Sequence, residues 1–136
     1  MKLYKLIPTF LLPLLLVLSA LMPSSSRAAG SVLDFIEAYY DGPDLDGAGS
    51  VTISSDNKHV YVTSQNNSAV VVFSRDSSSG QLTFVEMLRD GVGGVDGLYF
   101  ASSVTVSPDD KHVYVTGLFD HAVAVFSRDS SSGQLT

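Results

Sequence analysis

Two short acidic segments contain the side chains most able to do chemistry. Asp120 and His121 are neighbours in the sequence. A carboxylate beside an imidazole can serve as a general base or as a pair of metal ligands. Asp44 and Asp46 lie in the turn-rich segment 41–47, which offers the hard oxygen ligands that calcium prefers. The alternative interpretation of both segments is a solvated polar loop, because adjacent side chains rarely converge on one ion.

The calcium interpretation does not extend to an EF-hand. If Asp44, Asp46 and Gly47 filled positions 3, 5 and 6 of that loop, position 1 would be Gly42 and position 12 Ile53, and neither is a ligand. The sequence also contains no nucleophile elbow, phosphate loop, zinc spacing or cofactor fingerprint. We therefore predict no metal site and no evident cofactor, and calcium stays open as an alternative.

The first 28 residues have the order of a secretory signal peptide. Lys2 and Lys5 are followed by the apolar run Leu6–Leu21 and then by a small, polar segment that ends at Ala28. An uncleaved membrane anchor is the alternative, but the run has 16 residues and two prolines, whereas a spanning helix needs about 20 residues. We predict cleavage after Ala28, no stable membrane span, and a periplasmic or extracellular protein.

Charge and composition exclude several partners. Without the signal peptide the chain keeps 5 basic and 14 acidic residues, a formal charge of −9. Such a chain repels the phosphate backbone of nucleic acids and anionic membrane surfaces. It has no cysteine, so disulfides, thiolate chemistry and haem attachment are excluded. An unknown small molecule or protein remains as the expected partner.

An internal repeat organises the rest of the chain. Residues 50–83 align with residues 103–136 at an offset of 53, with 25 of 34 positions identical. A weaker echo relates residues 33–37 to residues 82–86. We place the repeats near residues 33–81 and 82–134, within a domain of residues 29–136. The second copy stops inside a turn, and we expect the sequence to be the N-terminal part of a longer protein.

Within one repeat the apolar residues alternate with a period of two, which predicts strands. We expect four strands near residues 50–54, 59–64, 69–75 and 82–89, joined by short turns. Asn57 and Asp110 are placed to tolerate the left-handed backbone of a type I turn, and Gly80 supplies positive φ in the next turn. No helix is predicted after the signal peptide. Each repeat is therefore a four-stranded antiparallel sheet, and the fold class is all-β.

Two nearly identical segments identify the family that the repeat resembles. Residues 54–63 read Ser-Ser-Asp-Asn-Lys-His-Val-Tyr-Val-Thr, and residues 107–116 read Ser-Pro-Asp-Asp-Lys-His-Val-Tyr-Val-Thr. They resemble the YVTN motif of the lactonase-like, seven-bladed β-propellers, although Asn57 and Asp110 stand where that family has glycine. The resemblance implies about two blades of a probable seven, with the remaining blades of the propeller as partners, and lactone hydrolysis as an activity.

Residues that recur in both copies are interpreted as structural. This applies to His59 and His112 and to the tyrosines two residues after them. The same reasoning covers Arg75 and Arg128, which we expect to pair with the neighbouring aspartate or to stay solvated.

Differences between the copies point to one end of the sheets. In a four-stranded blade, the loops at 41–49, 64–68, 90–102 and 117–121 emerge on the same side, and these loops carry almost all the differences. Loops on a rigid scaffold are where binding residues gather. The candidate binding residues are Asp44, Asp46, Asp96, Asp120 and His121; no catalytic residue is assigned. We expect an exported binding scaffold, with a lactone hydrolase as the alternative.

Overall fold

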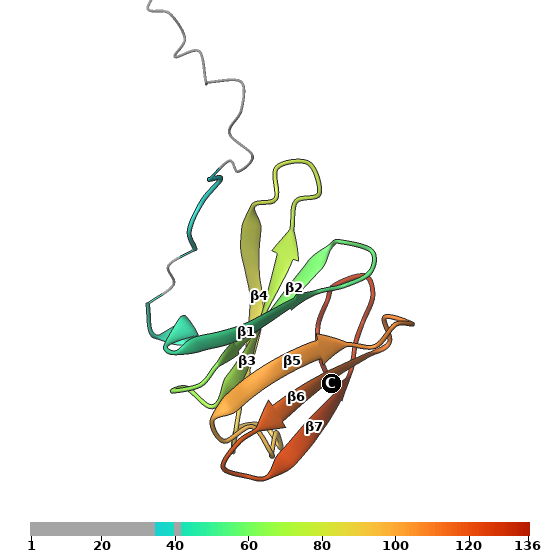
Figure 1. Ribbon diagram of the computed structural model, residues 1–136. Helices are drawn as coiled ribbons and strands as arrows, with labels where there is room; N and C mark the ends of the chain where they lie inside the picture. The colour runs from blue at the N-terminus through green and yellow to red at the C-terminus, as the bar shows by residue number, and fades with distance from the viewer. Residues whose placement is uncertain (1–34, 40–41) are drawn as a thin grey trace, which may run out of the picture. The chain divides into compact units, whose positions relative to one another are not determined.

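The computed structural model describes residues 35–39 and 42–136, and within them seven β-strands form two antiparallel sheets (Figure 1). The predicted signal peptide and cleavage site lie outside the described residues. The strands are β1 (Ala48–Ile53), β2 (His59–Ser64), β3 (Ala69–Arg75), β4 (Leu82–Arg89), β5 (Ala101–Val106), β6 (His112–Gly117) and β7 (Ala122–Ser127).

The strand prediction and the all-β fold class are confirmed. β1 to β4 pair in sequence order in the first sheet, and β5 to β7 do so in the second. Their β-branched and aromatic residues favour a pleated, half-buried surface. The first sheet thus spans residues 48–89. These limits differ from those of the predicted repeats, near 33–81 and 82–134. The repeat limits stay a prediction. One four-residue 3₁₀ helix, Gly42–Leu45, was not predicted; single turns of this kind commonly connect strands.

The turns have the chemistry that the sequence indicated. Asn57 and Asp110 both have φ of 61°, and Gly80 has φ of 84°. The carboxylate of Asp76 accepts hydrogen bonds from the backbone N–H groups of Ser78 at 2.9 Å and Ser79 at 2.7 Å. These local bonds fix the hairpin between β3 and β4, so the register of each sheet follows from its turns.

The main core lies between the two sheets. One face of the first sheet contributes three fully buried side chains, Tyr61, Val70 and Val72. They contact the second sheet through Val113 and Phe126, which are 0% and 6% exposed. Burying one such side chain contributes about 1.5–3 kcal/mol. Packing between the sheets is therefore what fixes the loops of one sheet beside those of the other.

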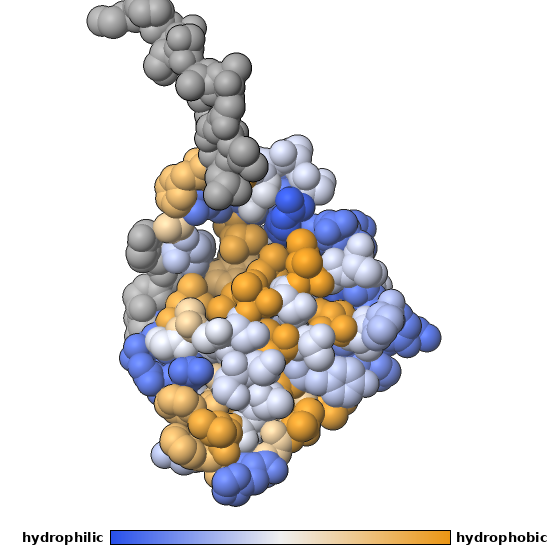
Figure 2. Space-filling model, viewed as in Figure 1, coloured by the Kyte–Doolittle hydropathy of each residue, from blue (hydrophilic) through white to orange (hydrophobic). Residues whose placement is uncertain are grey.

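The outer faces are only partly covered. On the first sheet, Val60, Val71 and Phe73 are buried against Tyr39 and Leu45, but other apolar side chains stay exposed. Figure 2 shows several apolar patches (orange) on the side in view, with hydrophilic residues (blue) toward its edges. Val51 of β1 is 67% exposed, and Val123 and Val125 of β7 are 59% and 58% exposed. Each sheet thus has two apolar faces, of which the other sheet covers only one.

A buried arginine connects the two sheets at the end opposite the variable loops. Arg128, whose side chain is 0% exposed, donates from Nε to the Tyr61 hydroxyl at 2.7 Å and from Nη1 to the Asp110 carbonyl at 3.0 Å. Its Nη2 lies 2.9 Å from Nδ1 of His59 and 3.6 Å from an Asp56 carboxylate oxygen. Four polar groups from the two repeats therefore converge on one guanidinium.

The predicted partner of Arg128, the neighbouring Asp129, was wrong. The guanidinium does not pair with the neighbouring aspartate; it crosses to the first sheet, where Asp56 supplies the opposite charge. His59 and Tyr61 have the structural role that their recurrence indicated. The Tyr61 hydroxyl donates to the Gly133 carbonyl at 2.9 Å, and a Cβ on Gly133 would overlap the His59 ring. Sequence comparison could not find these contacts because they join residues about 70 positions apart.

We predict that Arg128→Met destabilises the chain by about 3 kcal/mol. Removing the guanidinium leaves Tyr61, His59 and Asp56 without their buried partner, which costs more than the lost attraction alone. Urea unfolding of the purified variant measures the effect. Lys111→Met is the control, because it removes one exposed positive charge next to the network; a change as large as that of Arg128→Met would contradict the interpretation.

Stability should depend on pH through His59. Burial, and then the positive charge of Arg128, lower the pKa of this imidazole below its ordinary value of 6.5. The unfolded chain therefore takes up a proton at a higher pH than the folded chain does. The contribution of His59 to the free energy of unfolding should therefore be fully present above about pH 6.5, and it should decrease as the pH falls below that value.

Urea midpoints between pH 5 and pH 8 test this dependence. His59→Gln should remove the decline in this range, whereas His112→Gln, at the same repeat position but only half-buried, should keep it. An equal decline in the His59→Gln variant would assign the effect to other groups.

Candidate functional site

The variable loops meet at one end of the sheets. In the first repeat, Gln65 donates its N–H to the Gly47 carbonyl at 3.0 Å, so the β2–β3 loop lies against the segment that precedes β1. In the second repeat, Phe119 donates its N–H in the same way to the Tyr99 carbonyl at 3.2 Å. We call this end, formed by residues 42–47, 64–68, 90–100 and 118–121, the loop rim.

Ser68 connects the two halves of the loop rim. Its carbonyl accepts the Asp90 N–H at 2.9 Å, and its hydroxyl oxygen accepts the Phe100 N–H at 3.1 Å. The backbone of Ser68 has φ of 53°, a conformation that costs free energy for a residue with a side chain. The first repeat therefore holds the loop between β4 and β5 in place.

Three carboxylates gather on this rim. Oxygen atoms of Asp90, Asp96 and Asp120 lie within 4.8 Å of one another. Leu98 donates its N–H to Asp90 at 3.0 Å, and Tyr99 donates its N–H to Asp120 at 2.8 Å. Such a group of carboxylates could hold a hard cation such as calcium.

The sequence singled out Asp96 and Asp120 but missed Asp90. The repeat alignment held no signal for Asp90, because it immediately follows β4 and looks like an ordinary strand end. Its place in the cluster depends on the path of the following loop, which brings it to Asp96 and Asp120.

The other three candidate residues do not join this cluster. Asp46 accepts a hydrogen bond from the Asn66 side-chain amide at 2.9 Å, which holds the two loops of the first repeat together. Asp44 lies in the 3₁₀ helix on the same side. His121 is exposed at the tip of the β6–β7 loop with φ of 52°. All five candidate residues thus lie on the loop rim, and two of them come together.

Aromatic rings lie beside the acidic cluster, which sequence reasoning also missed. The ring of Phe119 is 5.3 Å from that of Tyr99 and 4.9 Å from that of Phe100. Tyr99 and Phe119 are 52% and 53% exposed. The backbone N–H of Tyr99 also binds Asp120, so the rings and the carboxylates form one surface.

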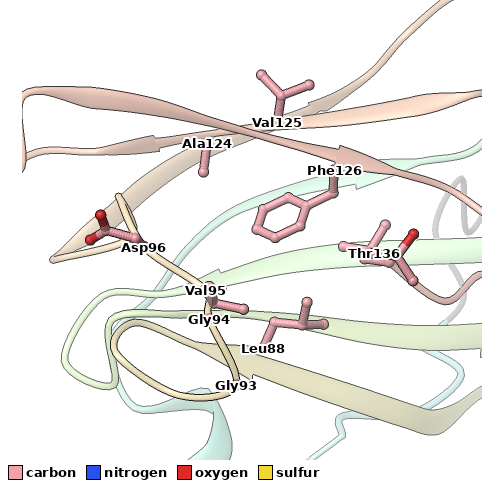
Figure 3. A pocket seen from close by; sticks show the side chains of 10 residues that line it. Leu88, Gly93, Gly94, Val95, Asp96, Ala124, Val125, Phe126 and Thr136 are labelled. Atoms are coloured by element: carbon pink, nitrogen blue, oxygen red, sulfur yellow. The ribbon is translucent and has the colours of Figure 1, made fainter.

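A cavity of about 550 Å³ lies between β4 and β7, and residues 93–96 of the loop rim form one side of it. Figure 3 shows Leu88 of β4, Val95 and Phe126 of β7 around it. Asp96 borders the cavity and belongs to the acidic cluster as well. The cavity is otherwise lined mostly by apolar side chains and glycine, so it is better suited to apolar side chains than to a polar ligand.

No helix within the described residues is both long and apolar enough to cross a membrane.

A family model described as lactonase, seven-bladed β-propeller, matches residues 28–136. The chain belongs to this family. Its two antiparallel sheets are therefore propeller blades, as the YVTN-like segments implied. A search of curated protein sequences gave no significant match.

Solved structures of similar fold agree with the family. The periplasmic gluconolactonase of Pseudomonas aeruginosa is 25% identical, with a TM-score of 0.61 over 72% of this chain and 27% of that one. A candidate 6-phosphogluconolactonase of Bacteroides fragilis is 25% identical, with a TM-score of 0.57 over 71% of this chain and 25% of that one. The chain therefore spans about a quarter of the length of these structures.

Calcium should bind at the three carboxylates rather than at the loop that contains Asp44. We expect a dissociation constant of about 10⁻⁴–10⁻³ M, the range of weak calcium sites with few carboxylate ligands. Isothermal titration should show weakening of at least tenfold in Asp96→Asn and in Asp120→Asn. Asp44→Asn, on the same loop rim but outside the cluster, is the control. Equal affinity in all three variants, or no saturation at millimolar calcium, would contradict this site.

Proposed function

We propose that the chain supplies a ligand-binding part of the loop rim in an exported lactonase-type propeller, and that the ligand is an uncharged sugar derivative. The observation that carries this proposal is the pairing of exposed rings, Tyr99 and Phe119, with the carboxylates Asp96 and Asp120 on one surface. The apolar C–H faces of a sugar stack on aromatic rings, and its hydroxyl groups donate to carboxylates, which only accept hydrogen bonds.

Charge favours an uncharged ligand over a phosphorylated one. Five aspartates of the described residues lie on or at the edge of the loop rim: Asp44, Asp46, Asp90, Asp96 and Asp120. Arg89, at the end of β4, lies close to the rim and donates to the Asn67 side-chain oxygen at 3.3 Å. A phosphate group would meet net repulsion on such a surface.

Export rests on the signal-peptide pattern of residues 1–28. The periplasmic location of the similar gluconolactonase supports the same interpretation. An exported protein meets uncharged sugar derivatives more readily than the phosphorylated intermediates of the cytoplasm, which agrees with the charge of the loop rim.

Hydrolysis of a sugar lactone is the second candidate function, favoured by the family and by both lactonase-type structures. His121 lies on the loop rim, next to Asp120 in the chain, and its imidazole could act as a general base. It would take a proton from a water molecule as that water attacks the lactone carbonyl. The ring C–O bond then breaks, and the ring oxygen receives a proton.

Titration of the full chain with D-glucitol, D-glucono-1,5-lactone and 6-phosphogluconate tests the proposal. We expect the two uncharged compounds to bind at least tenfold more tightly than the phosphorylated one, and Phe119→Ala to weaken them at least tenfold. Phe35→Ala, an 81% exposed aromatic residue outside the loop rim, should have no effect. Tighter binding of 6-phosphogluconate would contradict the proposed ligand class.

The same preparation separates binding from hydrolysis. Lactone opening is followed by titration of the released acid, with and without a calcium chelator. A rate above the uncatalysed one that falls at least a hundredfold in His121→Gln would support the hydrolase. Ligand binding without lactone hydrolysis above the uncatalysed rate would support the function as a binding scaffold.

A further inference from the structure

The chain follows the same backbone path into the first strand of each sheet. In the first repeat, the Gln65 N–H donates to the Gly47 carbonyl at 3.0 Å. In the second repeat, the Leu118 N–H donates to the Phe100 carbonyl at 3.2 Å. Gly47 has φ of 69° and Phe100 has φ of 58°. Phe100 is therefore the equivalent of Gly47, and the fold requires a left-handed backbone at both positions.

Glycine suits this backbone, whereas phenylalanine does not. Glycine adopts positive φ at little cost because it has no Cβ. In other residues the Cβ approaches the following carbonyl oxygen, and a bulky side chain at positive φ is a conformational outlier. The other non-glycine residues with positive φ in the described part of the chain are all polar: Asn57, Ser68, Asp110 and His121. Phe100 therefore has a strained backbone at a position where the first repeat avoids strain.

Hydrogen bonds on both sides hold Phe100 in this conformation. Its N–H donates to the Ser68 hydroxyl oxygen at 3.1 Å, and its carbonyl accepts the Leu118 N–H. Ser68 is itself fixed, because its carbonyl accepts the Asp90 N–H at 2.9 Å. Strained residues persist where the surrounding structure determines their conformation, and they gather at functional sites. The strain at Phe100 thus points to a use for its side chain.

The ring of Phe100 contacts the ring of Phe119. Phe100 is half-buried, and the two ring centroids lie 4.9 Å apart with 43° between the ring planes. Phe119 also contacts the ring of Tyr99, at a centroid distance of 5.3 Å. Tyr99 and Phe119 are the exposed rings of the loop rim. Phe119 therefore has two aromatic neighbours, and Phe100 is the less exposed of them.

The first repeat has a polar link where the second has this group of rings. Asp46 and Asn66, whose side chains are joined at 2.9 Å, are the equivalents of Tyr99 and Phe119. A Cβ on Gly47 would lie 3.1 Å from the side-chain nitrogen of Asn66, so this link leaves little room for a side chain there. All three positions of the second repeat thus carry rings in place of small or polar residues.

We propose that Phe100 is a positioning residue, whose ring holds the ring of Phe119 beside Tyr99 in the orientation that binds the ligand. This inference rests on the proposed binding of a sugar derivative at the loop rim. A ring that is already held in its binding orientation loses less conformational entropy when a ligand stacks on it. The Tyr99 N–H also donates to Asp120 at 2.8 Å, so the same short stretch of backbone places a ring and a carboxylate of the site.

Urea unfolding of matched variants measures the strain. Phe100→Ala and Phe100→Gly both remove the ring, but only the glycine variant relieves the strain of positive φ. Phe100→Gly should therefore have the higher urea midpoint, by about 0.5 M, although glycine ordinarily stabilises less than alanine. Phe119 does not have positive φ, so Phe119→Ala should have a higher midpoint than Phe119→Gly. The same order at Phe100 as at Phe119 overturns the strain argument.

NMR contacts between ring protons test the positioning role. In the unaltered chain, nuclear Overhauser effects should connect the rings of Tyr99 and Phe119, as their separation of 5.3 Å requires. Folded Phe100→Ala and Phe100→Gly should lose most of this intensity, and Phe100→Tyr, which keeps a ring, should restore it. A residue that only stabilised the fold would lower the urea midpoint without changing these contacts. Undiminished intensity in Phe100→Ala and Phe100→Gly overturns the proposal.

Binding of D-glucitol separates this inference from the proposed function. Phe100→Gly should weaken binding about tenfold, because Phe119 is then no longer held, and Phe100→Tyr should restore it. Phe35→Ala, which removes an 81% exposed ring outside the loop rim, should leave the affinity unchanged. Absence of binding by the unaltered chain contradicts the proposed function. Binding by the unaltered chain with equal affinity in Phe100→Gly overturns the positioning role alone.

Discussion

Each of the two sheets in the described residues has two apolar faces, and this constraint governs the rest of their structure. Burial of Tyr61, Val70 and Val72 by the second sheet supplies the main core. Two sheets provide one shared interface, which leaves one outer face of each to be covered by something else. The exposure of Val51 and Val125 follows directly. A ring of blades resolves the conflict, because each face then has a neighbour.

The same interface determines where function can lie. At one end the sheets are joined by Arg128, whose contacts with His59 and Tyr61 require those residue types. The same residue types recur at that end in the second repeat, as His112 and Tyr114. At the other end, Ser68 joins the loops through backbone groups and one hydroxyl, which leaves neighbouring side chains free to differ. The acidic and aromatic residues of the loop rim occupy this permissive end.

The loop rim and the space between the sheets meet in the loop before β5. The loop rim contributes Tyr99, Phe119 and the carboxylates. Asp96 borders both the acidic cluster and the cavity between β4 and β7. This loop therefore connects the candidate site with the packing of the two sheets.

The sequence by itself determined the strands, the turns and the family, because these depend on local patterns: β-branched and aromatic runs in β2 and β3, positive φ at Asn57 and Asp110, and a repeat of 53 residues. It also located the variable end of the sheets. Only the tertiary structure decided that Asp90 joins Asp96 and Asp120, and that Arg128 crosses to the first sheet. These contacts join residues far apart in the chain, and their distances depend on how the two sheets stack, which no local pattern encodes.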